Sequence, residues 1–193
     1  MRVSRQYFTP VVAAILIFFM VLPTSTLAQA AADSRAERLN ALFEQLKQPV
    51  DGDWRAVERQ ILVLWSDSGS PAMNLLLERG RQAIVKKDYP KAIEHLSALV
   101  EQAPNFAEGW NARATAYFLM GDYTLAVQDI QTTLSLEPRH FGALAGLGMI
   151  FERVDRPDKA LVADRAALAI HPFLPAVIEA VKRLELETGG TSL

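Results

Sequence analysis

The chain has 193 residues, with 20 Lys and Arg, 22 Asp and Glu and no cysteine, a length that suits one domain or a short repeat array. Without cysteine it has no disulfide, no thiolate metal site, no cysteine nucleophile and no cysteine for lipid attachment. Its net charge is slightly negative, whereas a nucleic-acid-binding protein needs a basic face. We therefore expect no nucleic-acid partner.

The first 30 residues have the three parts of a secretory signal peptide. Arg2 and Arg5 precede an apolar run of 12 residues, 11–22, and an Ala-x-Ala site ends at Ala30. As a helix this run spans about 18 Å, whereas crossing a bilayer requires about 20 residues. We therefore expect cleavage after Ala30, membrane contact only through the uncleaved leader, and export to the bacterial periplasm; retention as an anchor is the alternative. Of the 20 basic residues, 18 then remain against 22 acidic ones.

Residues 31–72 are expected to form a helical hairpin. The first helix has apolar residues at i, i+3, i+4 and i+7, namely Leu39, Leu42, Phe43 and Leu46. After a turn at 49–53, Asp53 is placed to cap a second helix, which carries Trp54, Val57, Ile61, Leu64 and Trp65 and stops at the Ser-Gly-Ser-Pro of 68–71. We interpret this hairpin as a degenerate first repeat that caps the array described next, with both tryptophans in its core.

A period of 34 residues governs the chain that follows. Four columns of similar residues recur at this spacing: Pro104, Pro138 and Pro172; Ala92, Ala126 and Ala160; Gly80, Ala114 and Gly148; and Leu76, Trp110 and Leu144. Four independent columns at one period indicate an internal repeat.

The pattern resembles the tetratricopeptide-repeat (TPR) family over residues 73–174, as ungapped units 73–106, 107–140 and 141–174. The middle unit matches best, with Trp110, Ala114, Tyr117, Gly121-Asp122-Tyr123, Ala126 and Pro138 at the family's signature positions. The resemblance implies an all-α fold, a right-handed superhelical array of antiparallel helix pairs. The sequence departs from the family at Leu99 and Thr133, which replace a small residue, and at Asp164, in the column of Leu96 and Ile130.

Each column also has a physical reason. The first helix of each unit is expected to end near Lys87, Gly121 or Asp155, and Gly121-Asp122 combines a helix stop with a cap for the next helix. Small residues in the column of Gly80 allow the two helices of a unit to cross closely. One unit alone leaves an apolar face bare, so the units must stack.

The end of the array is also predicted. Residues 175–187 form an amphipathic pattern that suits a capping helix, and 188–193 are expected to be a flexible tail. We interpret Asp164 as a carboxylate at the array's end, paired with Lys182 or Arg183 or solvated. The alternative is a buried contact that selects a partner.

The sequence has few residues in arrangements typical of catalytic or metal-binding sites. His95, His140 and His171 share no metal-ligand spacing, and we expect them at solvated or edge positions. The glycine run that begins at Gly142 lies inside a repeat helix and lacks the Lys-Ser/Thr ending of a phosphate loop. No serine elbow or paired acid and base is recognisable. We therefore expect no enzyme activity, no cofactor and no metal.

The resemblance also implies a binding surface. In TPR arrays positions two, five, nine and twelve of each unit line a concave groove, which gives here Asn74, Leu77, Arg81, Ile84, Asn111, Thr115, Phe118, Met149 and Glu152, and also Glu108, Gly142 and Ala145. Some family members hold a C-terminal carboxylate with Lys, Arg and Asn on these faces, but here only Arg81 offers a cation. The apolar positions instead suit an amphipathic helix or an extended segment.

The sequence thus predicts a non-catalytic scaffold or adaptor of the bacterial periplasm that binds a protein or peptide in this groove. The alternative is a structural protein that self-associates into a homo-oligomer, or a subunit of a larger envelope complex. The sequence does not identify the partner.

Overall fold

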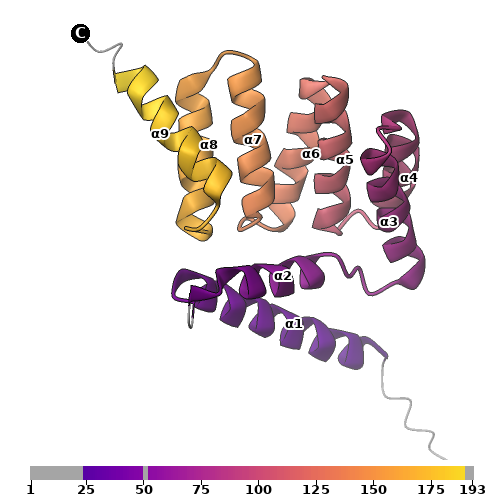
Figure 1. Ribbon diagram of the computed structural model, residues 1–193. Coiled ribbons are helices and arrows are strands. Elements are labelled where there is room, and N and C mark those ends of the chain that lie inside the picture. Colours follow the sequence, from indigo (N-terminus) through magenta and orange to yellow (C-terminus); the bar gives the residue numbers. More distant parts are fainter. Residues whose placement is uncertain (1–23, 50–51, 190–193) are drawn as a thin grey trace, which may run out of the picture.

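The computed structural model describes residues 24–49 and 52–189, which are helical apart from short connections (Figure 1). The predicted all-α class is confirmed for these residues. Most of the predicted signal peptide (1–23) and the end of the predicted tail (190–193) lie outside the described residues. The first helix, α1 (Thr24–Lys47), contains the predicted cleavage point after Ala30. None of the described helices has the length and apolar character needed to span a membrane.

Three antiparallel helix pairs form the array and stand side by side in Figure 1. The pairs are α3 (Pro71–Val85) with α4 (Tyr89–Gln102), α5 (Ala107–Met120) with α6 (Tyr123–Leu136), and α7 (Phe141–Arg153) with α8 (Pro157–Ile170). The second and third pairs fall within the units 107–140 and 141–174, and the first pair begins two residues before the unit 73–106. The array is therefore the stack of units that the period predicts.

The turns within the pairs follow the expected chemistry. The chain takes a positive φ at Lys87 (60°), Gly121 (85°) and Asp155 (55°), the left-handed conformation that ends many helices. Directly after Gly121, the Asp122 carboxylate accepts a hydrogen bond from the backbone N–H of Leu125 at 3.2 Å and caps α6.

Small residues let the helices of a pair cross closely. A Cβ added to Gly80 of α3 would lie 2.5 Å from Cγ of Leu96 on α4, closer than real carbon contacts allow. In the third pair the same column places Gly148 against Asp164, where an added Cβ would lie 2.0 Å from Oδ1. The repeated small residue is thus a requirement of close packing.

The predicted C-terminal cap is present as α9 (Pro175–Gly189), which extends two residues beyond the expected end. Leu184 and Val181 of α9 pack with Ala160 and Leu161 of α8. This helix covers the apolar face that the last unit would otherwise expose.

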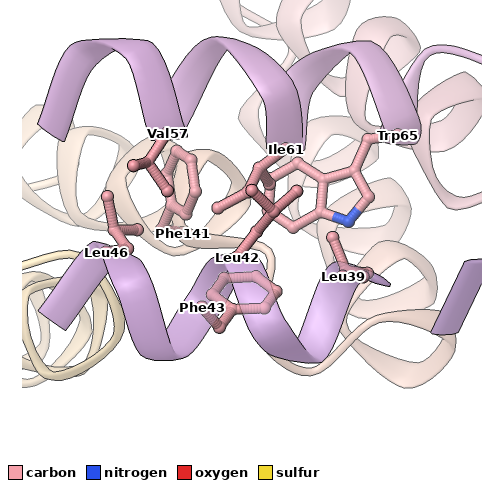
Figure 2. Packing of buried hydrophobic residues seen from close by; sticks show 8 residues of the cluster. All are labelled: Leu39, Leu42, Phe43, Leu46, Val57, Ile61, Trp65 and Phe141. Atoms are coloured by element: carbon pink, nitrogen blue, oxygen red, sulfur yellow. The ribbon is translucent and has the colours of Figure 1, made fainter. Parts of the chain in front are cut away.

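The N-terminal hairpin, α1 with α2 (Trp54–Trp65), has a well-packed core (Figure 2). Its buried members are Leu39, Leu42, Phe43, Leu46, Val57, Ile61 and Trp65, joined by Phe141 from the start of α7. The Asp53 carboxylate caps α2 by accepting from the N–H of Ala56 at 3.1 Å. Both tryptophans contribute to packing, as expected.

The position of the hairpin differs from the predicted one, in which it caps the array as a degenerate first repeat. It does not stack on α3 as a first repeat; it crosses the ends of the repeat helices on one side of the array (Figure 1). Phe141 in its core and a hydrogen bond of 2.7 Å from Arg139 to Asn40, 99 residues away, tie it to the loop between α6 and α7.

The composition of α3 explains why no other described helix stacks on its outer face. In α5, Ala112 and Ala116 pack against α4. The residues 34 positions earlier are Glu78 and Gln82, both exposed and joined by a hydrogen bond of 2.7 Å. A polar outer face is what the terminal unit of a solenoid needs. The array therefore begins at α3, and the hairpin is free to pack elsewhere.

The small-residue column gives a direct test. Gly80→Ala should lower the free energy of unfolding by about 1–3 kcal/mol, because the added methyl group must displace Leu96. Gly146→Ala is the matched control, since its Cβ would meet no atom closer than Cδ1 of Ile130 at 3.7 Å. The control should be neutral or up to about 1 kcal/mol more stable. Urea denaturation measures both; equal stabilities would contradict the packing argument.

Candidate partner-binding groove

The predicted groove residues are divided by the structure into a centre and two ends. The centre is a small hollow between α5 and α7 of about 80 Å³, which we call the central groove. It is lined by Asn111, Ala114, Thr115, Phe118, Ile130, Gly142, Gly146, Met149 and Ile150. Five of the predicted groove positions, Asn111, Thr115, Phe118, Gly142 and Met149, therefore share one surface.

The central groove combines apolar walls with one amide. Met149 is 50% exposed and Phe118 is half-buried, so both present apolar surface to solvent. Gly142 and Gly146 of α7 have no side chains to fill the space between them. Asn111 donates from Nδ2 to Glu108 at 3.3 Å, which leaves its Oδ1 available as an acceptor.

The N-terminal end of the predicted groove is occupied by the chain itself. Asn74 hydrogen-bonds to Ser68 and Asp67 in the connection between α2 and α3. Leu77 is buried in the core of the first pair, and Ile84 packs against that core. These three residues serve the fold and offer little surface to a partner.

The side chain of Arg81 is also engaged in contacts within the molecule. Its guanidinium donates to Ser66 at 3.0 Å and forms an ion pair with the buried Glu108. The one cation at a groove position is therefore neutralised inside the molecule. This arrangement agrees with the sequence argument against capture of a C-terminal carboxylate in the groove.

At the C-terminal end, Glu152 of α7 forms an ion pair with Arg183 of α9. The capping helix α9 thus neutralises the carboxylate of Glu152, which was predicted to lie at the edge of the groove. Of the predicted groove, the central groove is therefore the part whose side chains are not engaged at either end.

Glu108 is the centre of a buried polar network that the sequence did not reveal. His140 lies 2.9 Å from Glu108 through Nε2, and its Nδ1 accepts from the N–H of Ala143 at 3.0 Å. Because Nδ1 is an acceptor, Nε2 carries the proton and donates to the carboxylate. Burial alone would raise the pKa of Glu108, but His140 and Arg81 outweigh it and lower that pKa below its ordinary value.

The expectation that the histidines are solvated or at edges is wrong for two of them. His140 is 2% exposed and His171 is 0% exposed. The ring of His140 stacks on Trp65 of the hairpin, with centroids 4.2 Å apart and planes 9° from parallel. Both histidines lie in loops after second helices, where the hairpin covers them.

His171 fixes the other end of the hairpin. Trp54 and Phe141 contact its ring edge to face, with centroids 5.4 and 4.9 Å away. Nδ1 accepts from the N–H of Phe173 at 3.2 Å, while Nε2 lies 3.5 Å from Glu58 without a hydrogen bond. Burial lowers the pKa of His171 despite the attraction of Glu58, so the imidazole is held neutral against the hairpin.

Asp164 also differs from the interpretation as a paired or solvated carboxylate. Its side chain is buried against Gly148, and Oδ2 has no hydrogen-bond partner among the described residues. Lys182 pairs with Glu179 and Arg183 with Glu152. Burial, with a smaller contribution from the charge of Glu152, raises the pKa of Asp164 from 3.8 to about 6. The charged form therefore destabilises the junction of α7 and α8.

The described residues hold no group of three or more His, Cys, Asp or Glu side chains that could bind a metal ion. The polar clusters found above join parts of the fold to each other. The central groove remains the part of the predicted site that faces solvent.

Comparison with known proteins agrees with this architecture. The tetratricopeptide-repeat family model matches residues 77–132 and 111–175. A TPR repeat-containing protein of Rhizobium etli is 37% identical over 161 residues, which cover 83% of this chain and 79% of that protein.

Solved structures share the fold at low identity. The Sgt2 TPR domain from Aspergillus fumigatus superposes with a TM-score of 0.60 at 20% identity, over 63% of this chain and 82% of that one. The first TPR of Spaghetti, bound to an HSP90 peptide, gives 0.59 at 18% identity, over 64% and 96%.

Asp164 provides a prediction about pH. Its raised pKa means that the folded state loses stability as the pH rises from 3.8 through about 6. Asp164→Leu, which copies Leu96 over Gly80 in the first unit, should stabilise the protein by roughly 3 kcal/mol at pH 7.5. The difference from wild type should shrink as the pH falls to 4. Thermal unfolding across this range measures it, and a variant less stable than wild type at pH 7.5 would refute the assignment.

Proposed function

The chain belongs to the tetratricopeptide-repeat family, and from this premise we propose that it is a non-catalytic scaffold that holds a segment of a partner polypeptide in the central groove. We propose further that it works outside the cytoplasm, in the bacterial periplasm, after removal of residues 1–30. The observation that carries the proposal is the hollow between α5 and α7, where apolar side chains stay exposed beside backbone without side chains.

The size of the central groove indicates what it accepts. A volume of about 80 Å³ holds one aliphatic side chain and no drug-sized ligand. The gap at Gly142 and Gly146 lets the backbone of a bound segment approach α7 closely. Phe118 and Met149 would then cover the inserted side chain, and Oδ1 of Asn111 would accept a backbone N–H.

The contacts at both ends limit the length of the bound segment. Asn74 and Arg81 are engaged with the α2–α3 connection and Glu108, and Glu152 is engaged with α9. A ligand that required these groups would have to break internal hydrogen bonds or ion pairs. We therefore propose a short contact with one apolar anchor.

The first TPR of Spaghetti is a relative in fold that is bound to an HSP90 peptide. This similarity supports the proposal that an array of this fold can bind a peptide. It does not extend to the sequence of the peptide, because the identity is only 18% and Arg81 is already paired here.

Two opposite changes test the central groove. Gly146→Leu should fill the hollow, since an added Cβ there meets nothing closer than 3.7 Å and the longer side chain would extend into the space. Phe118→Ala should remove its cover. Each should reduce capture of the partner at least tenfold, measured by affinity capture with the mature chain 31–193 from an envelope fraction.

Val162→Ala is the control, because Val162 is 69% exposed on α8, away from the central groove. Its capture should equal that of wild type. Equal capture by all four proteins would place the partner elsewhere. The intact mass of the chain recovered from the periplasm reports whether it begins at residue 31.

A further inference from the structure

A second and larger hollow lies between the N-terminal hairpin and the array. Its volume is about 460 Å³, within the range of small-ligand sites. We call it the hairpin cleft. It is lined by Arg35, Leu39, Trp65 and Ser68 from the hairpin side and by residues 102–108, Leu136 and Glu137 from the ends of α4, α5 and α6. The lining is distinct from that of the central groove.

One part of the hairpin cleft is apolar. Leu39 and Trp65 contribute buried side chains from the hairpin, and Phe106 and Leu136 contribute partly exposed ones from the array. Leu136 is 39% exposed although it is a leucine at the end of a packed helix. The apolar part of a ligand would find contacts on both sides of the cleft.

Among the charged side chains that line the cleft, both carboxylates have ion-pair partners and neither of them pairs with Arg35. Glu108 pairs with Arg81 and His140, while Glu137 pairs with Arg139 at 3.3 Å.

Arg35 donates to the backbone carbonyl of Leu64 but forms no ion pair with any described residue. The exposed Asp67 is near enough for Arg35 to contribute to the lowering of its pKa, after the hydrogen bonds from Asn74 and Gly69. Asp67 itself is not part of the lining. Among the described residues, the guanidinium is therefore the charged group of the cleft lining that has no ion-pair partner within that lining.

Two exposed amides and one buried indole N–H belong to residues of the cleft lining and have no acceptor among the described residues. The side-chain amides of Gln102 and Asn105 are exposed and make no hydrogen bond to another described residue. The indole N–H of Trp65 is buried without an acceptor, and its nitrogen points toward Leu39 (Figure 2). A ligand oxygen that moved the Leu39 side chain aside would satisfy this donor, which is costly to leave unpaired.

We propose that the hairpin cleft binds a carboxylate attached to an apolar group. The carboxylate would pair with Arg35 and accept from the amides of Gln102 and Asn105, while the apolar group packs on Trp65, Phe106 and Leu136. One guanidinium matches the geometry and the single charge of a carboxylate. A dianionic phosphate is disfavoured because Glu108 and Glu137 are close by.

This chemistry occurs in a small organic acid and at the C-terminus of a polypeptide, so the experiment has an arm for each. The probes are 4-phenylbutyrate, the peptide Gly-Ser-Gly-Leu-Phe with a free C-terminus, and the C-terminal amide of each. The readout is the set of indole N–H signals in ¹⁵N-labelled protein. Trp65, which lines the cleft, should shift on titration, and Trp54, on the far side of the hairpin core, should not.

Arg35→Gln should weaken binding of the acid probe at least tenfold, with a matched control in Arg38→Gln on the same helix but outside the cleft. Because Arg35 also bonds to Leu64, Asn105→Asp is a second variant that leaves the hairpin untouched. Its added negative charge should weaken binding as well.

Binding of either acid form, lost in Arg35→Gln and Asn105→Asp and kept in Arg38→Gln, supports the assignment and identifies the source of the carboxylate. Amides that bind as tightly as the acids, unchanged affinity in both cleft variants, or no shift of Trp65 with any probe would overturn it. Since groove variants such as Phe118→Ala leave this cleft intact, failure here is distinguishable from failure of the proposed function.

Discussion

The face of Trp65 rests on the imidazole of His140, and this contact decides where the N-terminal hairpin lies. The imidazole is held from both sides, by the N–H of Ala143 on Nδ1 and by Glu108 on Nε2. A ring fixed by two hydrogen bonds loses little further entropy when an aromatic side chain covers it. Arg81 completes the network by neutralising Glu108. The network thus joins α3, α5, the loop before α7 and the hairpin in one buried polar cluster.

The position of the hairpin has two consequences for the surface of the molecule. Because it crosses the ends of the repeats, it leaves the centre of the inner face open, and the central groove between α5 and α7 stays accessible. It also encloses the hairpin cleft against the loops of the array. The polar face of α3, with Glu78 and Gln82, makes this arrangement compatible with an array that has no stacked N-terminal unit.

The 34-residue period was sufficient to predict the array because each of its columns records a contact between neighbouring helices, such as Gly80 with Leu96. The course of the hairpin was not predictable in this way, since its contacts join residues as distant as Asn40 and Arg139. The same contacts bury His140 and His171, whose loop positions suggested solvent. The aromatic neighbours Phe141 and Phe173 were the available signal. The groove positions came from the family pattern, which cannot show that Asn74, Arg81 and Glu152 are engaged internally.

The placement of the hairpin across the ends of the repeat helices is tested most directly by the proximity of Trp65 to His140. Ring centroids 4.2 Å apart predict strong nuclear Overhauser effects between the indole and imidazole protons of the folded chain. Their presence, together with effects between Phe43 and Trp65, whose centroids are 5.9 Å apart, would establish this placement. Effects from Trp65 to the outer face of α3 at Glu78 and Gln82, with none to His140, would show a stacked first repeat and contradict the account.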